Sequence, residues 1–113
     1  MEKVIDMVYL FGFSPRFGNE LNRLVPILKS QIEKGKKISI VFIHDGVIGT
    51  SSKGKITESV NILRGLMLKK YVMTPDLAAR GIPLEHIQED LQPIDYMELV
   101  AIMENSNKII SWM

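Results

Sequence analysis

Residues 38–47 read ISIVFIHDGV, and this stretch decides the fold class. Residues 38–43 are apolar apart from Ser39, and His44, Asp45 and Gly46 follow them directly. A run that is apolar on both faces is typical of a strand buried inside a parallel sheet. The polar residues then mark the carboxyl end of that strand, because Asp and Gly favour turns.

Three further stretches have the composition of strands, namely residues 4–11, 70–73 and 108–112. Residues 84–94 have no clear pattern and could contain another short strand. Predicted strands and helices alternate along the chain, and parallel strands need long crossover connections. The order therefore predicts an α/β fold with a parallel sheet covered by helices on both faces.

Helix signals separate the first three strands. Asn19 can cap an amphipathic helix that Gly35 ends. Pro26 lies inside this segment, so we expect a kink or a late start. Residues 59–68 can form a second helix.

Two later helices have clearer boundaries. Thr74 can cap a third helix with Pro75 at its first helical position, and Gly81 can end it. Asp95 and Glu98 are three residues apart, which is the spacing of a capping box. They predict a fourth helix that runs through Glu104.

Composition excludes several classes of protein. The chain has 113 residues, a formal net charge of +1 and no cysteine. Disulfides, thiolate metal sites and a cysteine nucleophile are therefore excluded, and the small excess of basic residues argues against direct nucleic-acid binding. No apolar run reaches about 18 residues, so we expect no membrane span. We expect a single domain over residues 1–113, located in the cytoplasm, with no cofactor and no bound metal.

The carboxyl ends of parallel strands share one edge of the sheet, where ligands of α/β proteins bind. We therefore expect residues 12–14, 44–46 and 74–76 on one rim. Neighbours on a strand point to opposite faces, which argues against His44 and Asp45 as an acid–base pair. We favour a structural reading, with Asp45 accepting loop N–H groups and Gly46 at positive φ, and leave a functional role for His44 open.

Other motifs give weaker evidence for a chemical function. Residues 49–56, GTSSKGKI, nearly match a phosphate-binding loop with Lys55 as its lysine, but Ile56 stands where a hydroxyl is needed. The segment is better read as a flexible loop. His86 is read as a surface histidine. Asp76 and Arg80, one helical turn apart, are expected to form a modest surface pair.

Four stretches together resemble the DsrH/TusB family, within the DsrE/DsrF/DsrH-like group of sulfur-relay proteins. They are Ser14–Pro15, Asp45–Val47, TPDLAARGI at 74–82, and the tail at 94–113 that ends in SWM. The resemblance covers nearly the whole chain in the right order. It implies a three-layer, flavodoxin-like (DsrEFH-like) fold with a mostly parallel sheet of about five strands and helices on both faces.

The resemblance also implies function. Such subunits form a hetero-oligomer with DsrE/TusD-like and DsrF/TusC-like partners, which pass persulfide sulfur toward tRNA wobble-uridine thiolation or in sulfur oxidation. Some DsrH-like members have a cysteine after the first strand, where this chain has Ser14. Serine cannot hold sulfane sulfur, because the thiolate is the nucleophile of this chemistry. The expected role is therefore a non-catalytic accessory subunit rather than an enzyme.

Candidate rim or partner-facing residues are Ser14, His44, Asp45, Gly46, Asp76 and Trp112, and none is assigned to catalysis. A protonated His44 could favour the thiolate of a partner's cysteine. The alternative function is a stand-alone homo-oligomer that binds a small anion or nucleotide on the rim. An exposed apolar patch would favour the assembly subunit, and a deep, closed polar pocket would favour the alternative. The isolated chain could also form homo-oligomers.

Overall fold

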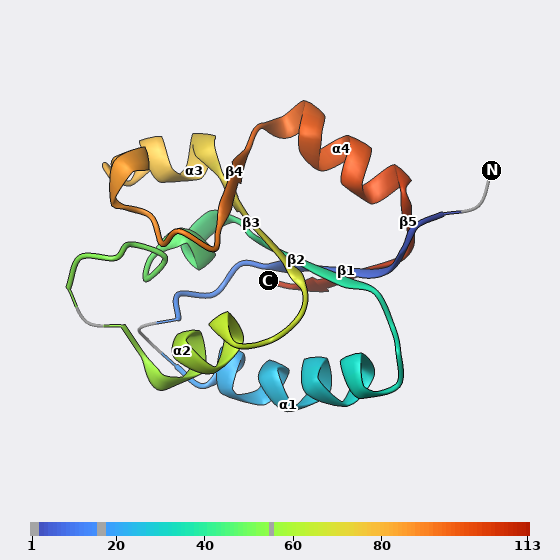
Figure 1. The fold of residues 1–113 in the computed structure, drawn as a ribbon. Coiled ribbons are helices and arrows are strands. Elements are labelled where there is room, and N and C mark those ends of the chain that lie inside the picture. The colour runs from blue at the N-terminus through green and yellow to red at the C-terminus, as the bar shows by residue number, and fades with distance from the viewer. Residues whose placement is uncertain (1–2, 16–17, 55) are drawn as a thin grey trace.

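Five strands make the sheet in the computed structural model of the chain, which describes residues 3–15, 18–54 and 56–113 (Figure 1). The strand order is β4-β3-β2-β1-β5, and every neighbouring pair in it is parallel. The strands are β1 Ile5–Phe11, β2 Ile38–Phe42, β3 Lys69–Met73, β4 Gln92–Ile94 and β5 Ser106–Trp112. The predicted parallel sheet is confirmed, and β4 is the short strand within residues 84–94.

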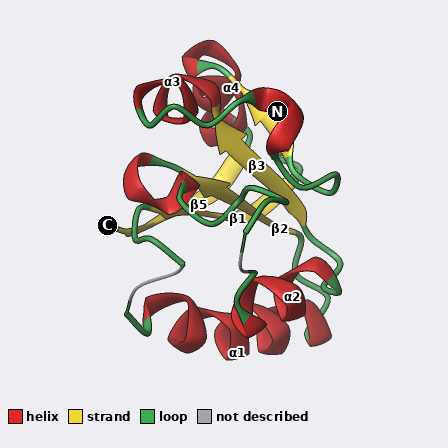
Figure 2. Ribbon diagram, turned by 90° about the vertical axis from the view of Figure 1, so that its left-hand side faces the viewer, coloured by secondary structure: helices red, strands yellow, loops and turns green. Residues whose placement is uncertain are grey.

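Helices cover both faces of this sheet, which makes the arrangement three-layered (Figures 1 and 2). Helices α1 Glu20–Glu33 and α2 Glu58–Arg64 lie on one face, and α3 Thr74–Ala79 and α4 Tyr96–Glu104 on the other. Two short 3-10 turns, η1 His44–Val47 and η2 Leu84–His86, complete the described elements.

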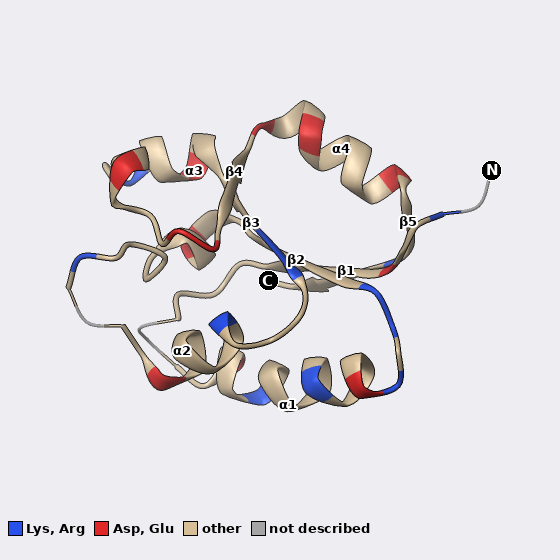
Figure 3. Cartoon of the chain, viewed as in Figure 1, with Lys and Arg blue, Asp and Glu red and all other residues tan. Residues whose placement is uncertain are grey.

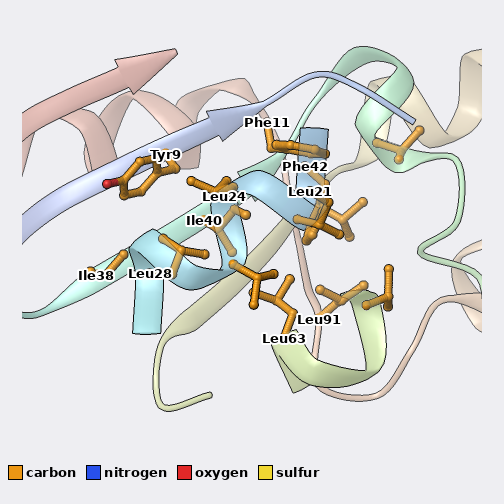
Figure 4. Packing of buried hydrophobic residues seen from close by; sticks show 14 of the residues in the cluster. Tyr9, Phe11, Leu21, Leu24, Leu28, Ile38, Ile40, Phe42, Leu63 and Leu91 are labelled. Carbon is orange, nitrogen blue, oxygen red and sulfur yellow. The ribbon is translucent and has the colours of Figure 1, made fainter. Parts of the chain in front are cut away.

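Alternation along the strands explains why two cores form. Tyr9 and Phe11 of β1 point toward α1 and α2, whereas Val8 and Leu10 point toward α4. In β2, Ile40 belongs to the first cluster in the same way (Figure 4). Successive side chains of a strand point to opposite faces, so a strand covered on both faces is expected to be mostly apolar. This is the pattern seen in residues 38–43.

Two helix boundaries differ from the prediction. Helix α1 begins at Glu20 and runs through Pro26 without a late start, and Asn19 occupies the N-cap position without a side-chain capping bond. Helix α2 ends at Arg64 rather than at residue 68. Gly65 follows it, and glycine is a poor helix former.

The later helices follow their predicted signals more closely. Met73, not Thr74, is the N-cap residue of α3, and Gly81 lies beyond its end with a φ of 66°. Both bonds of the predicted capping box are present in α4. The Glu98 N–H donates to the Asp95 carboxylate at 2.8 Å, and the Asp95 N–H donates to the Glu98 carboxylate at 3.1 Å. No helix of the described residues combines the length and the apolar character that crossing a bilayer needs.

Candidate functional site

The predicted rim is the edge at which the five parallel strands end. β3, β2, β1 and β5 lie side by side, so Asp76, His44, Ser14 and Trp112 follow or end neighbouring strands. Backbone bonds continue past the strand ends. The Gly12 N–H donates to the carbonyl of Trp112 at 2.8 Å, and the Ile43 N–H donates to that of Phe11 at 3.0 Å.

The turn η1 begins at a residue with an uncommon backbone conformation. His44 has a φ of 54°, the one positive φ at a non-glycine residue in the described part of the chain. This left-handed conformation costs roughly 1–2 kcal/mol for most residues. The His44 N–H donates to Oδ2 of Asp76 at 3.0 Å, which helps to hold the turn. The imidazole itself is on the exposed surface.

Arg80 links the two acidic residues of the rim. Its Nη2 lies 2.9 Å and its Nε 3.2 Å from Oδ1 of Asp45. Its Nη1 lies 3.7 Å from Oδ1 of Asp76 and donates to the Asp76 carbonyl at 3.3 Å. The guanidinium therefore ties η1 to α3.

Two expectations about this cluster are corrected. Asp76 is 9% exposed, so its pair with Arg80 is not a surface pair. The carboxylate is drawn inward because it accepts the His44 N–H. Asp45 does fix the turn, but in the described residues its side chain accepts from Arg80 instead of from loop N–H groups.

Gly46 is required for a different reason than the predicted one. It is absent from the glycines with positive φ in the described residues. A Cβ at this position would clash with the carbonyl oxygen of Phe11. Glycine therefore allows η1 to approach the end of β1 closely, while His44 takes the positive φ.

Ser14 and Trp112 belong to the other half of the rim. Ser14 is half-buried in the segment after β1. The Trp112 side chain packs against the core on the α1 face, so it contributes to packing whether or not a partner also touches it. The structure thus brings His44, Asp45, Gly46 and Asp76 into one unit. The candidate residues omitted Arg80, although its spacing from Asp76 was a signal for it.

The loop after η1 is partly anchored. Ser51 and Ile87 form an isolated β-bridge, and the Gln88 N–H donates to the Thr50 carbonyl at 2.9 Å. His86 is half-buried against this loop and lines a hollow of about 250 Å³ with residues such as Lys53. Residues 50–52 of the predicted flexible loop are thus hydrogen-bonded to residues 86–88. The phosphate-loop lysine considered above, Lys55, lies outside the described residues.

The charged groups of the rim cluster bond mainly to one another and to the backbone of the turn. Its carboxylates are used in hydrogen bonds and ion pairs with Arg80 and the turn backbone. Among the described residues, no group of three His, Cys, Asp or Glu side chains could hold a metal ion. The His44 side chain and the Asp45 carboxylate both remain accessible on this turn.

The fold and rim define a class, the three-layer α/β proteins with a parallel five-stranded sheet. The YchN protein of Escherichia coli has this fold, with a TM-score of 0.78, 13% identity, and coverage of 96% of this chain and 99% of that one. A protein of unknown function from Methanobacterium thermoautotrophicum gives a TM-score of 0.73 at 13% identity, covering 92% and 98%. At this identity, the likeness shows the fold alone.

A comparison of the sequence with family models identifies the family of this chain. A family model described as DsrH like protein matches residues 14–109, and the chain belongs to that DsrH-like family. The resemblance inferred from the four sequence stretches is confirmed. No curated protein matches the chain.

Proposed function

We propose that this chain is a non-catalytic subunit of a sulfur-relay complex, in which DsrE- and DsrF-type partners carry the persulfide. One observation carries the proposal, namely a DsrH-like chain with no cysteine among its 113 residues. Sulfur relay needs a thiolate to attack and hold sulfane sulfur. A member without any thiol can act only on the thiol of another chain.

An exposed apolar surface on α4 supports assembly with such partners. Tyr96, Met97 and Val100 are 57%, 82% and 51% exposed, although a surface helix normally presents polar residues to water. We name these three residues the α4 surface. Met and Tyr are enriched in protein interfaces, and their adjacency on one helix makes a continuous contact area. We infer that a DsrE- or DsrF-type partner covers it.

The rim supports a second part of the proposal. His44 is exposed on a turn whose backbone is held by Asp76 and whose Asp45 is held by Arg80, so the imidazole is presented at the surface from an anchored backbone. A cation beside a thiol lowers the pKa of that thiol by roughly 1–3 units. A partner's cysteine docked at this rim would therefore be more reactive. The final acceptor would be tRNA wobble uridine or a sulfur-oxidation enzyme.

The first experiment is co-purification of the tagged chain from its own host, with identification of the bound proteins by mass spectrometry. Recovery of cysteine-bearing DsrE- or DsrF-type proteins in a fixed ratio supports the proposal. Recovery of the chain alone, as monomer or homo-oligomer, contradicts it and returns attention to the stand-alone anion-binding alternative.

The α4 surface is tested with the double variant Met97→Glu/Val100→Glu. Burying carboxylates against an apolar partner is costly, so we expect the complex to weaken by about tenfold or more. The matched control is Ile27→Glu on α1, where a 40% exposed apolar residue lies on the opposite face. Equal partner affinity in the double variant and the wild type, measured by titration, contradicts this assignment.

The role of His44 is tested in the assembled complex with His44→Ala. The protonated form of an imidazole favours a nearby thiolate, so removal of this side chain should slow persulfide transfer by about tenfold while the complex stays assembled. His86→Ala is the control, since His86 is the second of the chain's two histidines. Transfer can be followed by alkylation of the partner's persulfide. An unchanged rate removes His44 from the proposal.

A further inference from the structure

A second recess lies at the opposite edge of the sheet from η1, where strands begin. It has a volume of about 590 Å³, which is within the usual range for small-molecule sites. We name it the amino-edge hollow. It lies over the first residues of β1, β2 and β3, and Asn105 at the end of α4 forms one side. Its basic lining comes from the α1–β2 connection and the start of β3, both blue in Figure 3.

The charged residues that line the hollow are all basic. They are Lys36, Lys37 and Lys69, and no acidic residue of the described chain lines it with them. Within the described residues, none of the three lysines takes part in an ion pair. The next residue, Lys70, points to the other face, where it lies 3.5 Å from Asp90. Because side chains alternate along β3, Lys70 forms an ion pair on one face, whereas Lys69 faces the hollow.

The negative partial charges at the nearby helix ends do not neutralise the positive charge of the three lysines. The ends of α1 and α4 each carry roughly −0.5 of an elementary charge, whereas three lysines carry +3. The carboxylate of Asp6 accepts the Lys37 N–H at 2.7 Å and adds one negative charge beside the hollow. The balance remains positive, so the hollow favours an anion.

A buried hydroxyl faces the same space. Ser39 is 1% exposed and lines the hollow. A ligand group that reaches this hydroxyl could exchange a hydrogen bond with it. The Tyr71 side chain also lines the hollow.

The remaining wall is apolar. Met67 is 86% exposed and lines the hollow beside Leu68, so a large apolar side chain is available to a ligand. An occupant that suits both walls has negative charge at one end and an apolar or aromatic body at the other. Lysine ammonium groups bind phosphate well, as point charges that need no fixed geometry.

We propose that the amino-edge hollow binds a nucleotide-sized, phosphate-bearing anion. Its phosphates would lie among Lys36, Lys37 and Lys69 near the Ser39 hydroxyl, and its apolar body against Met67. This site is at the opposite edge from the His44 rim. It is therefore independent of the proposed sulfur-relay function, and either can fail without the other.

The test is a titration of the full chain with ADP carrying a fluorescent ribose label, followed by competition with unlabelled ADP, pyrophosphate and adenosine. We expect saturable binding that salt weakens, displacement by ADP and by pyrophosphate, and poor displacement by adenosine. The double variant Lys37→Ala/Lys69→Ala should weaken binding by about tenfold or more. Ser39→Ala should weaken it less.

The control variant is Lys29→Ala/Lys108→Ala, which removes the same charge from α1 and β5, outside the hollow. Its affinity should stay close to that of the wild type. Absence of saturable binding overturns the proposal. An equal loss in both double variants also overturns it, because the attraction would then depend on net charge rather than on this hollow.

Discussion

Asp76 is the residue on which the geometry of the rim depends most. Its carboxylate accepts the N–H of His44, whose positive φ would otherwise be disfavoured, and it also lies beside Arg80. Asp45 makes a shorter contact with the same arginine, but its side chain is 64% exposed. Burial, rather than distance, decides which carboxylate matters for stability, because water screens exposed pairs.

We therefore expect Asp76→Ala to lower the free energy of unfolding by about 1–3 kcal/mol, since a partly buried N–H loses a charged acceptor. Asp45→Ala should change it by less than about 1 kcal/mol. Urea unfolding of both variants measures the difference. Asp76→Asn keeps an acceptor and should lie between Asp76→Ala and the wild type. An equal loss in Asp45→Ala and Asp76→Ala would contradict this ranking.

Among the elements, α4 combines a well-defined start with a weakly buried body. The capping box of Asp95 and Glu98 satisfies N–H groups of its first turn. Of its residues only Leu99 is fully buried. Local capping therefore adds about 1 kcal/mol to the packing of Leu99, Ile102 and Met103 on the core.

Asp95→Ala is expected to lower the free energy of unfolding by about 1 kcal/mol, the usual cost of a lost N-cap. Asp95→Asn should cost only a few tenths of that, because asparagine also accepts the Glu98 N–H. Thermal unfolding of the two variants tests this. A similar loss for both would mean that the charge at the helix start, rather than the cap bond, stabilises α4.

Local signals predicted the elements well, and long-range contacts explain the rest. The capping box joins residues three apart, so its pattern is visible in the chain. Arg80 and Asp45 are 35 residues apart, and nothing near either residue indicates their contact. Gly46 was expected to need positive φ, but its constraint comes from the Phe11 carbonyl on another strand.

At the scale of the whole molecule, burial of Tyr71 couples stability to alkaline pH. Burial raises the pKa of the Tyr71 hydroxyl above its ordinary value of 10.0. The unfolded chain then loses this proton at a lower pH than the folded protein does. The stabilisation is fully present below pH 10.0 and is lost as the pH rises through the folded pKa.

We expect Tyr71→Phe to flatten the decline of stability above pH 10.0, because the titrating group is gone. The measurement is urea unfolding at a series of pH values from neutral to alkaline. Tyr96→Phe is the control, since Tyr96 is 57% exposed. Parallel curves for wild type and Tyr71→Phe would show that this hydroxyl titrates alike in both states.

The strand order also governs when the sheet can be completed during synthesis. β1 pairs with β2 on one side, but its other edge waits for β5, and Val4 and Asn105 near the start of that pairing are 101 residues apart. A ribosome adds about 5–20 residues each second, so β1 has one open edge for roughly 5–20 s. Open apolar edges invite pairing between nascent chains. Slower translation of residues 95–112 should therefore raise the aggregated fraction.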